Sequence, residues 1–280
     1  MGKTGERIKG GVLIIGSLFW QDGSTRQPWD LQRKNWRDKH LILANQKKVT
    51  APIRYGRYSA PTNINELYTM VLSKNLDNGF SSPNMGEAYV VELRPKFNQQ
   101  DFTEQLNSAV KELSIAEGVF TRDSFFMKNW CTISILINQN SPFAPLITST
   151  WSKAWKNEVN QYEKLHNAQN YYQRFRQGSE SPVITQDGIL DLNPFHPIDE
   201  NTGKPSPKNI FDEAGYDFIL AAVTVPQNKG QKPGTRKNQN YPNPETIGKL
   251  AKYDKRQYFQ HNRQWGIKTF QDEQISQYCT

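Results

Sequence analysis

Apolar runs separated by turn residues dominate the first half of the chain, and this pattern predicts a β-rich region. Residues 11–15 form a continuous apolar run that ends at Gly16, as a buried strand does. Three further strands are expected, at residues 47–59, 67–73 and 86–94. The segment 75–85 is expected to form a hairpin loop between the last two strands. Residues 26–40, rich in Trp and Arg, are expected to form a surface segment with three anchors, Trp29, Leu31 and Trp36.

A helix is expected next, over residues 101–117. Asp101 can cap its first turn, and Glu104 three residues later would complete a capping box. One apolar stripe follows helical spacing and comprises Phe102, Leu106, Ala109, Val110 and Leu113. Gly118 supplies the expected stop. Alternating apolar residues then predict a strand at 125–138.

The second half of the chain has a different character. A long helix is expected at residues 149–176, where an aromatic stripe along one side indicates core packing rather than a ligand site. Three segments follow it, a loop-like region at 177–215, a strand at 216–225 and a basic loop at 226–243. A last helix is expected at 243–262, with a cap and a proline at its start. These elements indicate a core at residues 1–145 and a helical, loop-rich extension at residues 146–280 packed on it.

Composition and charge narrow the classes of partner. Lys and Arg exceed Asp and Glu by 35 to 27, a net charge of +8, but no block of five or six like charges occurs. The excess is therefore expected on solvated faces, and a nucleic-acid partner is not expected. No stretch approaches the ~18 apolar residues that a membrane helix needs, so no membrane partner is expected either. Two cysteines and four isolated histidines predict neither a disulfide framework nor a metal site, which favours a cytoplasmic protein.

Glu117 is the candidate for acid/base chemistry. It lies four residues after Leu113 and seven after Val110, so it continues the apolar stripe of its helix. It also lies in the last turn, where the helix dipole disfavours a negative charge. Both effects would raise the pKa of its carboxyl group toward the range useful for proton transfer. Helix geometry alone leaves the alternative that Glu117 is exposed at a frayed helix end.

Two short motifs resemble one enzyme family. Residues 13–20, Leu-Ile-Ile-Gly-Ser-Leu-Phe-Trp, are similar to the first strand and loop of the gamma-glutamylcyclotransferase family, especially its ChaC-like branch. Residues 113–119, Leu-Ser-Ile-Ala-Glu-Gly-Val, resemble the family segment that contains the catalytic glutamate. The order and spacing of the motifs also agree, and the resemblance covers about residues 11–140.

The resemblance implies an α+β fold, a mixed β-barrel or sheet with a packed helix, to which the second half adds a helical and loop-rich elaboration. It also implies an enzyme that cyclises a gamma-glutamyl amine or amide to 5-oxoproline and releases the amine. No cofactor or metal is needed, and the partner is the small gamma-glutamyl compound. Glu117 would be the general acid/base. Four residues would bind the substrate, Gly16, Ser17, Leu18 and Phe19.

Two departures from the family pattern leave the activity open. Ile15 replaces the usual tyrosine before Gly-Ser, and Ser114 stands where an aspartate is frequent. The alternative is a non-catalytic interaction or small-molecule-binding protein that uses its basic, aromatic-rich second half.

The remaining basic and thiol groups are interpreted as structural or solvated. Strand alternation puts Arg54 and Arg57 on opposite faces, so at most one of them can reach the pocket, and surface positions on an edge strand are expected for both. Cys131 is expected to be a buried, inert thiol. Four cations of the loop at 226–243 are expected in a mobile, solvated segment, Lys229, Lys232, Arg236 and Lys237.

Overall fold

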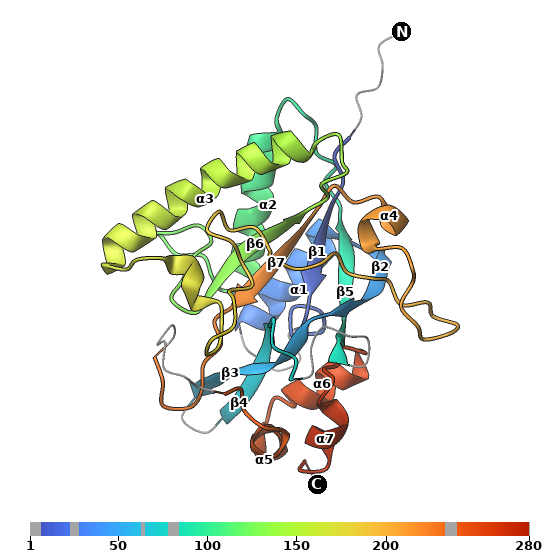
Figure 1. Ribbon diagram of the computed structural model, residues 1–280, viewed down its shortest axis with the longest axis vertical. Helices are drawn as coiled ribbons and strands as arrows, with labels where there is room; N and C mark the ends of the chain where they lie inside the picture. Colours follow the sequence, from blue (N-terminus) through green and yellow to red (C-terminus); the bar gives the residue numbers. More distant parts are fainter. Residues whose placement is uncertain (1–6, 23–27, 63–64, 78–83, 233–239, 280) are drawn as a thin grey trace.

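The computed structural model describes residues 7–22, 28–62, 65–77, 84–232 and 240–279. The fold is mixed α+β and is built on a five-stranded sheet with the strand order β2-β5-β1-β7-β6 (Figure 1). The strands of this sheet are β1 (Gly10–Ile14), β2 (Leu41–Ala51), β5 (Gly86–Leu93), β6 (Cys131–Ile137) and β7 (Phe218–Thr224). A separate two-stranded sheet consists of β3 (Ile53–Thr62) and β4 (Asn65–Leu72).

The central strand β1 is where the predicted apolar run lies, and all five of its residues are buried. It pairs antiparallel with β5 on one side and parallel with β7 on the other. Parallel strands need a long connection between them, and here most of the chain lies between the paired residues Gly10 and Phe218. The expected core 1–145 and the expected extension 146–280 thus contribute strands to one sheet.

The segment expected as a single strand at 47–59 is two strands. Pro52, which has no N–H to donate to a ladder, separates β2 from β3, and its carbonyl accepts a hydrogen bond from Ser73. After this break β3 pairs only with β4. The segment 75–85 therefore joins strands that do not pair with each other, so the expectation of a hairpin loop was wrong; residues 78–83 lie outside the described part. One sheet closing into a barrel was also expected, but the described strands form two sheets and no closed barrel.

Helix α1 (Pro28–His40) occupies the segment expected to be a surface segment, for which no helix was predicted. Its buried face carries Trp36 and Arg37, whereas Leu31, expected as an anchor, is exposed; the placement of the Trp29 side chain is not described. Helix α2 (Phe102–Ala116) is the predicted amphipathic helix and packs beside α1. Gly118 ends it with φ +69, a left-handed conformation that glycine adopts readily.

The expected capping box at the start of α2 is not formed. The side chain of Asp101 makes no capping hydrogen bond. Instead the Asn98 side chain accepts a hydrogen bond from the Asp101 amide at 2.8 Å. The apolar stripe itself is confirmed, because Phe102, Leu106, Val110 and Leu113 are all buried.

The long helix of the second half is α3 (Ala144–His166), which begins and ends earlier than expected. Its aromatic stripe packs in the core, as predicted, with Trp151 and Trp155 each 1% exposed. A short 3-10 helix, η2 (Tyr171–Arg174), and a short helix, α4 (Ile210–Ala214), interrupt the loop-like region before β7.

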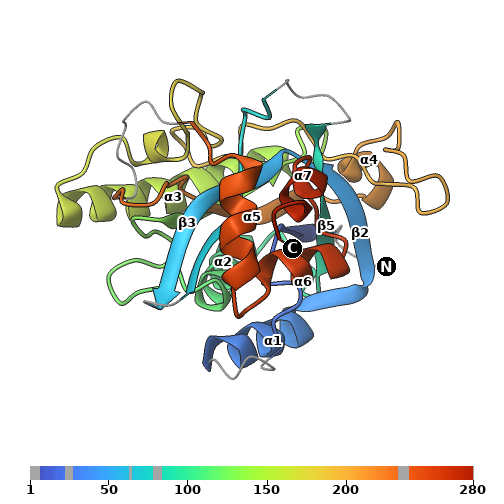
Figure 2. The same ribbon diagram turned by 90° about the horizontal axis from the view of Figure 1, so that it is seen from below.

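The helix expected at 243–262 is two helices, α5 (Pro244–Tyr253) and α6 (Tyr258–Gln264), followed by α7 (Asp272–Ser276). Asn243 caps α5 through its side chain and Pro244 stands at its start, as predicted. Asp254 ends α5 and caps the next turn by accepting hydrogen bonds from the amides of Arg256 and Tyr258. The three helices gather around the β3–β4 hairpin (Figures 1 and 2).

The basic loop at 226–243 has packed ends. Gln227 exchanges backbone hydrogen bonds with β3, and Lys229 forms an ion pair with Glu66 at 2.6 Å. The Tyr241 side chain is 9% exposed. The expectation of a wholly solvated loop is therefore wrong for its ends, while Arg236 and Lys237 lie outside the described residues.

No helix in the described part of the chain is long and apolar enough to cross a membrane.

Candidate functional site

A cavity of about 420 Å³ lies where the loop after β1 meets the end of α2 and the β3–β4 hairpin. Its wall combines elements from the whole chain, including the segment 15–18 after β1 and the segment 115–118 at the end of α2. The other residues that matter for its chemistry are Arg33, Arg57, Trp130, Cys131, Arg256 and Tyr258.

Glu117 lines this cavity as the C-cap residue, directly after the last residue of α2. Its side chain is 19% exposed, so the position is largely buried rather than frayed into solvent. Burial raises the pKa of its carboxyl group, and the Arg33 guanidinium opposes that rise. Arg33 Nη2 lies 3.3 Å from Glu117 Oε2. Within the described part of the chain, Oε1 accepts no hydrogen bond, which leaves one carboxylate oxygen open to a ligand.

Two arginines of α1 hold the loop that follows β1. Arg37 is buried and donates to the carbonyl oxygens of Leu18 and Gln21 at 2.7 and 2.6 Å. Arg33 donates to the Ser17 hydroxyl at 2.8 Å and to the Gln21 side chain. The same Arg33 guanidinium reaches Glu117, so one planar group spans the distance between the loop and the carboxylate.

The opposite side of the loop packs on α6. The Trp20 indole donates to the buried Asn262 side chain at 2.7 Å. Gly16 lies against the hydroxyl end of Tyr258, and a Cβ at this position would be 2.5 Å from the phenol oxygen. Only glycine allows this close approach. The C-terminal part of the chain thereby completes the wall and places a hydroxyl beside the loop.

The structure brings four of the five predicted site residues to one cavity: Gly16, Ser17, Leu18 and Glu117. The backbone amides of the first three donate no hydrogen bond within the described part of the chain. They are available for an anionic or carbonyl oxygen. The fifth residue, Phe19, lies elsewhere and stacks on Tyr89, with ring centroids 4.5 Å apart.

Ser114, the second departure from the family pattern, does not line the cavity. It is fully buried, and its hydroxyl donates to the Val110 carbonyl at 2.7 Å. Cys131 does line the cavity, and burial raises the pKa of its thiol, which fits the inert cysteine that was predicted.

Sequence reasoning missed several residues of the site. Arg33 lies in the segment interpreted only as a surface segment, although it stands three residues before Trp36 and four before Arg37, at helical spacing. Tyr258 carries no sequence signal that connects it to Gly16, because the contact joins residues from opposite ends of the chain.

Arg54 and Arg57 were expected on opposite faces of an edge strand, exposed to solvent. A β-bulge at Gly56 shifts the register, so that Arg54 pairs with Val71 and Arg57 with Thr69. Val71 and Thr69 are two residues apart and share a face, so the two arginines share one as well. Arg54 is 2% exposed and lines a different cavity, so the expected surface position was wrong for this residue. Of the two arginines only Arg57 lines the cavity of Glu117, in agreement with the prediction that at most one of them does.

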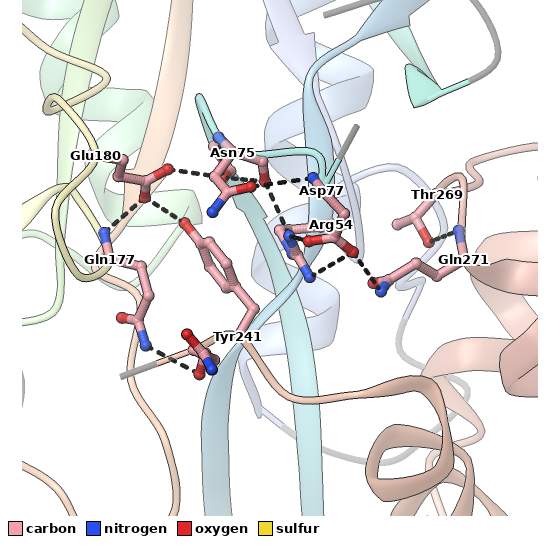
Figure 3. A network of polar contacts seen from close by, with 10 residues as sticks. Arg54, Asn75, Asp77, Gln177, Glu180, Tyr241, Thr269 and Gln271 are labelled. Carbon is pink, nitrogen blue, oxygen red and sulfur yellow. Dashed lines mark hydrogen bonds and ion pairs between the residues drawn. The ribbon is translucent and has the colours of Figure 1, made fainter. Parts of the chain in front are cut away.

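The second cavity, about 480 Å³, contains a polar network that is satisfied largely from within the protein (Figure 3). Arg54 forms an ion pair with Asp77 at 2.7 Å and lies 4.0 Å from the centre of the Tyr241 ring. The Tyr241 hydroxyl donates to Glu180 at 2.6 Å, and Glu180 also accepts from the Gln177 amide. Burial raises the pKa of Glu180, and these hydrogen bonds oppose the rise.

Among the residues that the structure describes, no three His, Cys, Asp or Glu side chains come together in a way that could hold a metal ion. No protein-family model, curated protein or solved structure matches this chain. The case for a function therefore rests on the cavity and its residues.

Proposed function

We propose that the protein is a cofactor-free acyl-transfer enzyme of the gamma-glutamylcyclotransferase type, which cyclises a gamma-glutamyl amine or amide to 5-oxoproline. The observation that carries the proposal is the meeting of Glu117 with the Gly16–Leu18 loop in one cavity. The sequence motifs that resemble the family are far apart in the chain, yet one guanidinium joins them.

The reaction joins two ends of one substrate. The α-amino nitrogen attacks the γ-carbonyl carbon, so orientation supplies much of the acceleration. The attacking nitrogen starts as an ammonium and loses two protons on the way to the lactam. Glu117 takes one of them and delivers it to the leaving nitrogen as the carbon–nitrogen bond breaks; the other leaves to water.

The position of Glu117 suits this exchange. Burial raises the pKa of its carboxyl group and so favours the protonated acid, while Arg33 opposes the rise and favours the carboxylate that acts as a base. Arg33 holds one carboxylate oxygen at 3.3 Å, and the other oxygen is open toward the substrate.

The loop after β1 would receive the negative charge. The amides of Gly16, Ser17 and Leu18 are unpaired within the described chain, and they can donate to the substrate carboxylate or to the oxyanion that forms at the γ-carbon. Arg37 fixes the loop by binding two of its carbonyl oxygens, so little reorganisation is needed during the reaction. Tyr258 brings a hydroxyl to the loop, where Ile15 lacks the one that the family's tyrosine provides.

The proposal is tested by incubating the purified protein with a panel of gamma-glutamyl amines, amino acids and peptides and measuring 5-oxoproline. Release above the background rate with any member supports the enzyme. Binding without turnover across the panel would instead favour the non-catalytic alternative on the same fold.

A further inference from the structure

Arg57 has no carboxylate partner for its charge among the residues that the structure describes. It lies on β3 directly after the bulge, is partly buried, and lines the cavity of Glu117. One face of its guanidinium lies over Trp130, 4.7 Å from the ring centre. Its Nε is buried and has no hydrogen-bond acceptor.

Three arginines in or beside the walls of the two cavities have acceptors. Arg33 binds Glu117, Arg37 binds two carbonyl oxygens, and Arg54 binds Asp77 and the Asn75 carbonyl. No carboxylate of the described residues lies within 4.0 Å of Arg57, so it forms no ion pair there. Arg54 provides a close comparison, because it stands on the same strand and the same face but has its charge paired with Asp77 (Figure 3). The Nε atoms of both arginines lack an acceptor among the described residues, so the two differ in the ion pair.

A guanidinium without a partner is costly in a partly buried site, because water no longer solvates it fully and no anion replaces the water. Burial accordingly lowers the pKa of Arg57. An unpaired cation in the wall of a cavity points to a role in binding rather than in folding.

We propose that Arg57 is an anion-binding residue of this cavity and that the ligand presents a carboxylate to it. A guanidinium offers parallel N–H donors that match the two oxygens of a carboxylate. Trp130 covers one face of the group, so an acceptor must approach the N–H donors along the edge of the guanidinium plane. The assignment holds whether or not the cavity carries out the proposed cyclisation.

The test uses glutarate, a five-carbon dicarboxylate that cannot cyclise, and glutaramide, which has the same length and no charge. Binding to the full chain is measured by calorimetry and by quenching of tryptophan fluorescence. We expect glutarate to bind the parent protein and glutaramide and inorganic phosphate to bind at least tenfold more weakly. Arg57→Met should weaken glutarate binding by about 10- to 100-fold, and Arg57→Lys should weaken it less, because it keeps the charge.

Thermal unfolding separates a binding role from a structural one. Arg57→Met removes an uncompensated charge, so its melting temperature should equal or exceed that of the parent. The matched variant Arg54→Met loses an ion pair and a hydrogen bond, and its melting temperature should fall by about 5 °C or more. The proposal is overturned if glutaramide or phosphate binds as well as glutarate, if Arg57→Met binds glutarate like the parent, or if Arg57→Met is as unstable as Arg54→Met. None of these readings involves 5-oxoproline, so such a failure leaves the proposed reaction to its own test.

Discussion

The contact between Gly16 and Tyr258 makes a quantitative prediction about how the C-terminal helices support the site. Gly16 does not occupy the left-handed region, so Gly16→Ala introduces no backbone strain. Its new Cβ would lie 2.5 Å from the Tyr258 oxygen, closer than real contacts allow. Overpacking of this kind costs about 1–3 kcal/mol, offset by about 0.4–1 kcal/mol because alanine restricts the unfolded chain.

The matched variant Tyr258→Phe removes the oxygen that the new Cβ would meet. Without the oxygen, the nearest ring atom to the new Cβ is Cζ at 3.5 Å, an ordinary van der Waals contact. Loss of the hydroxyl should by itself cost about 1 kcal/mol. The double variant keeps only the gain from the restricted unfolded chain, so it should be about 0.4–1 kcal/mol more stable than Tyr258→Phe alone, which corresponds to a coupling energy of about 1–3 kcal/mol.

The assay is urea unfolding of the four proteins, followed by tryptophan fluorescence and compared at equal m values. Additive effects, within about 0.5 kcal/mol, would refute the reasoning. In that case the loop moves away from α6 on substitution, and Tyr258 has no fixed place in the wall of the cavity.

Two further predictions concern titratable groups. Arg33→Gln removes the cation that lowers the pKa of Glu117, so the acidic limb of the pH–activity profile should move to higher pH. Arg33→Lys keeps the charge and should move the limb less. An unchanged limb would show that Arg33 does not act on the acid/base group. Burial raises the pKa of Asp272 from 3.8 to about 6. The folded protein therefore loses about 3 kcal/mol of stability, relative to low pH, as the pH rises from about 4 through 6. Asp272→Asn keeps an oxygen for the two hydrogen bonds from Thr269 and removes the buried charge. It should raise the melting temperature at pH 8 and change it little at pH 4. An equal effect at both pH values would contradict the raised pKa.

The elements with strong local periodicity could be predicted from the sequence. The strand β1, the stripe of α2 and the stop at Gly118 are each dictated by residues close together in the chain. The position of Glu117 on that stripe follows from the same spacing, and its partial burial agrees with it.

The features that depend on distant contacts could not be predicted. Parallel pairing of β1 with β7 and the packing of Tyr258 on Gly16 join the two ends of the chain, and neither leaves a local pattern. The faces of Arg54 and Arg57 were misassigned because one extra residue in a bulge reverses strand alternation.

The most direct measurement of the central proposal is 5-oxoproline release by the parent protein and by Glu117→Gln, each with the best substrate of the panel. Gln keeps the shape of Glu and can still accept a hydrogen bond from Arg33, but it cannot exchange a proton near neutral pH. We expect a loss of about 10²- to 10⁴-fold in turnover, with a melting temperature within a few degrees of the parent. Equal turnover by the folded variant would contradict the role of Glu117 as the acid/base group of this cavity.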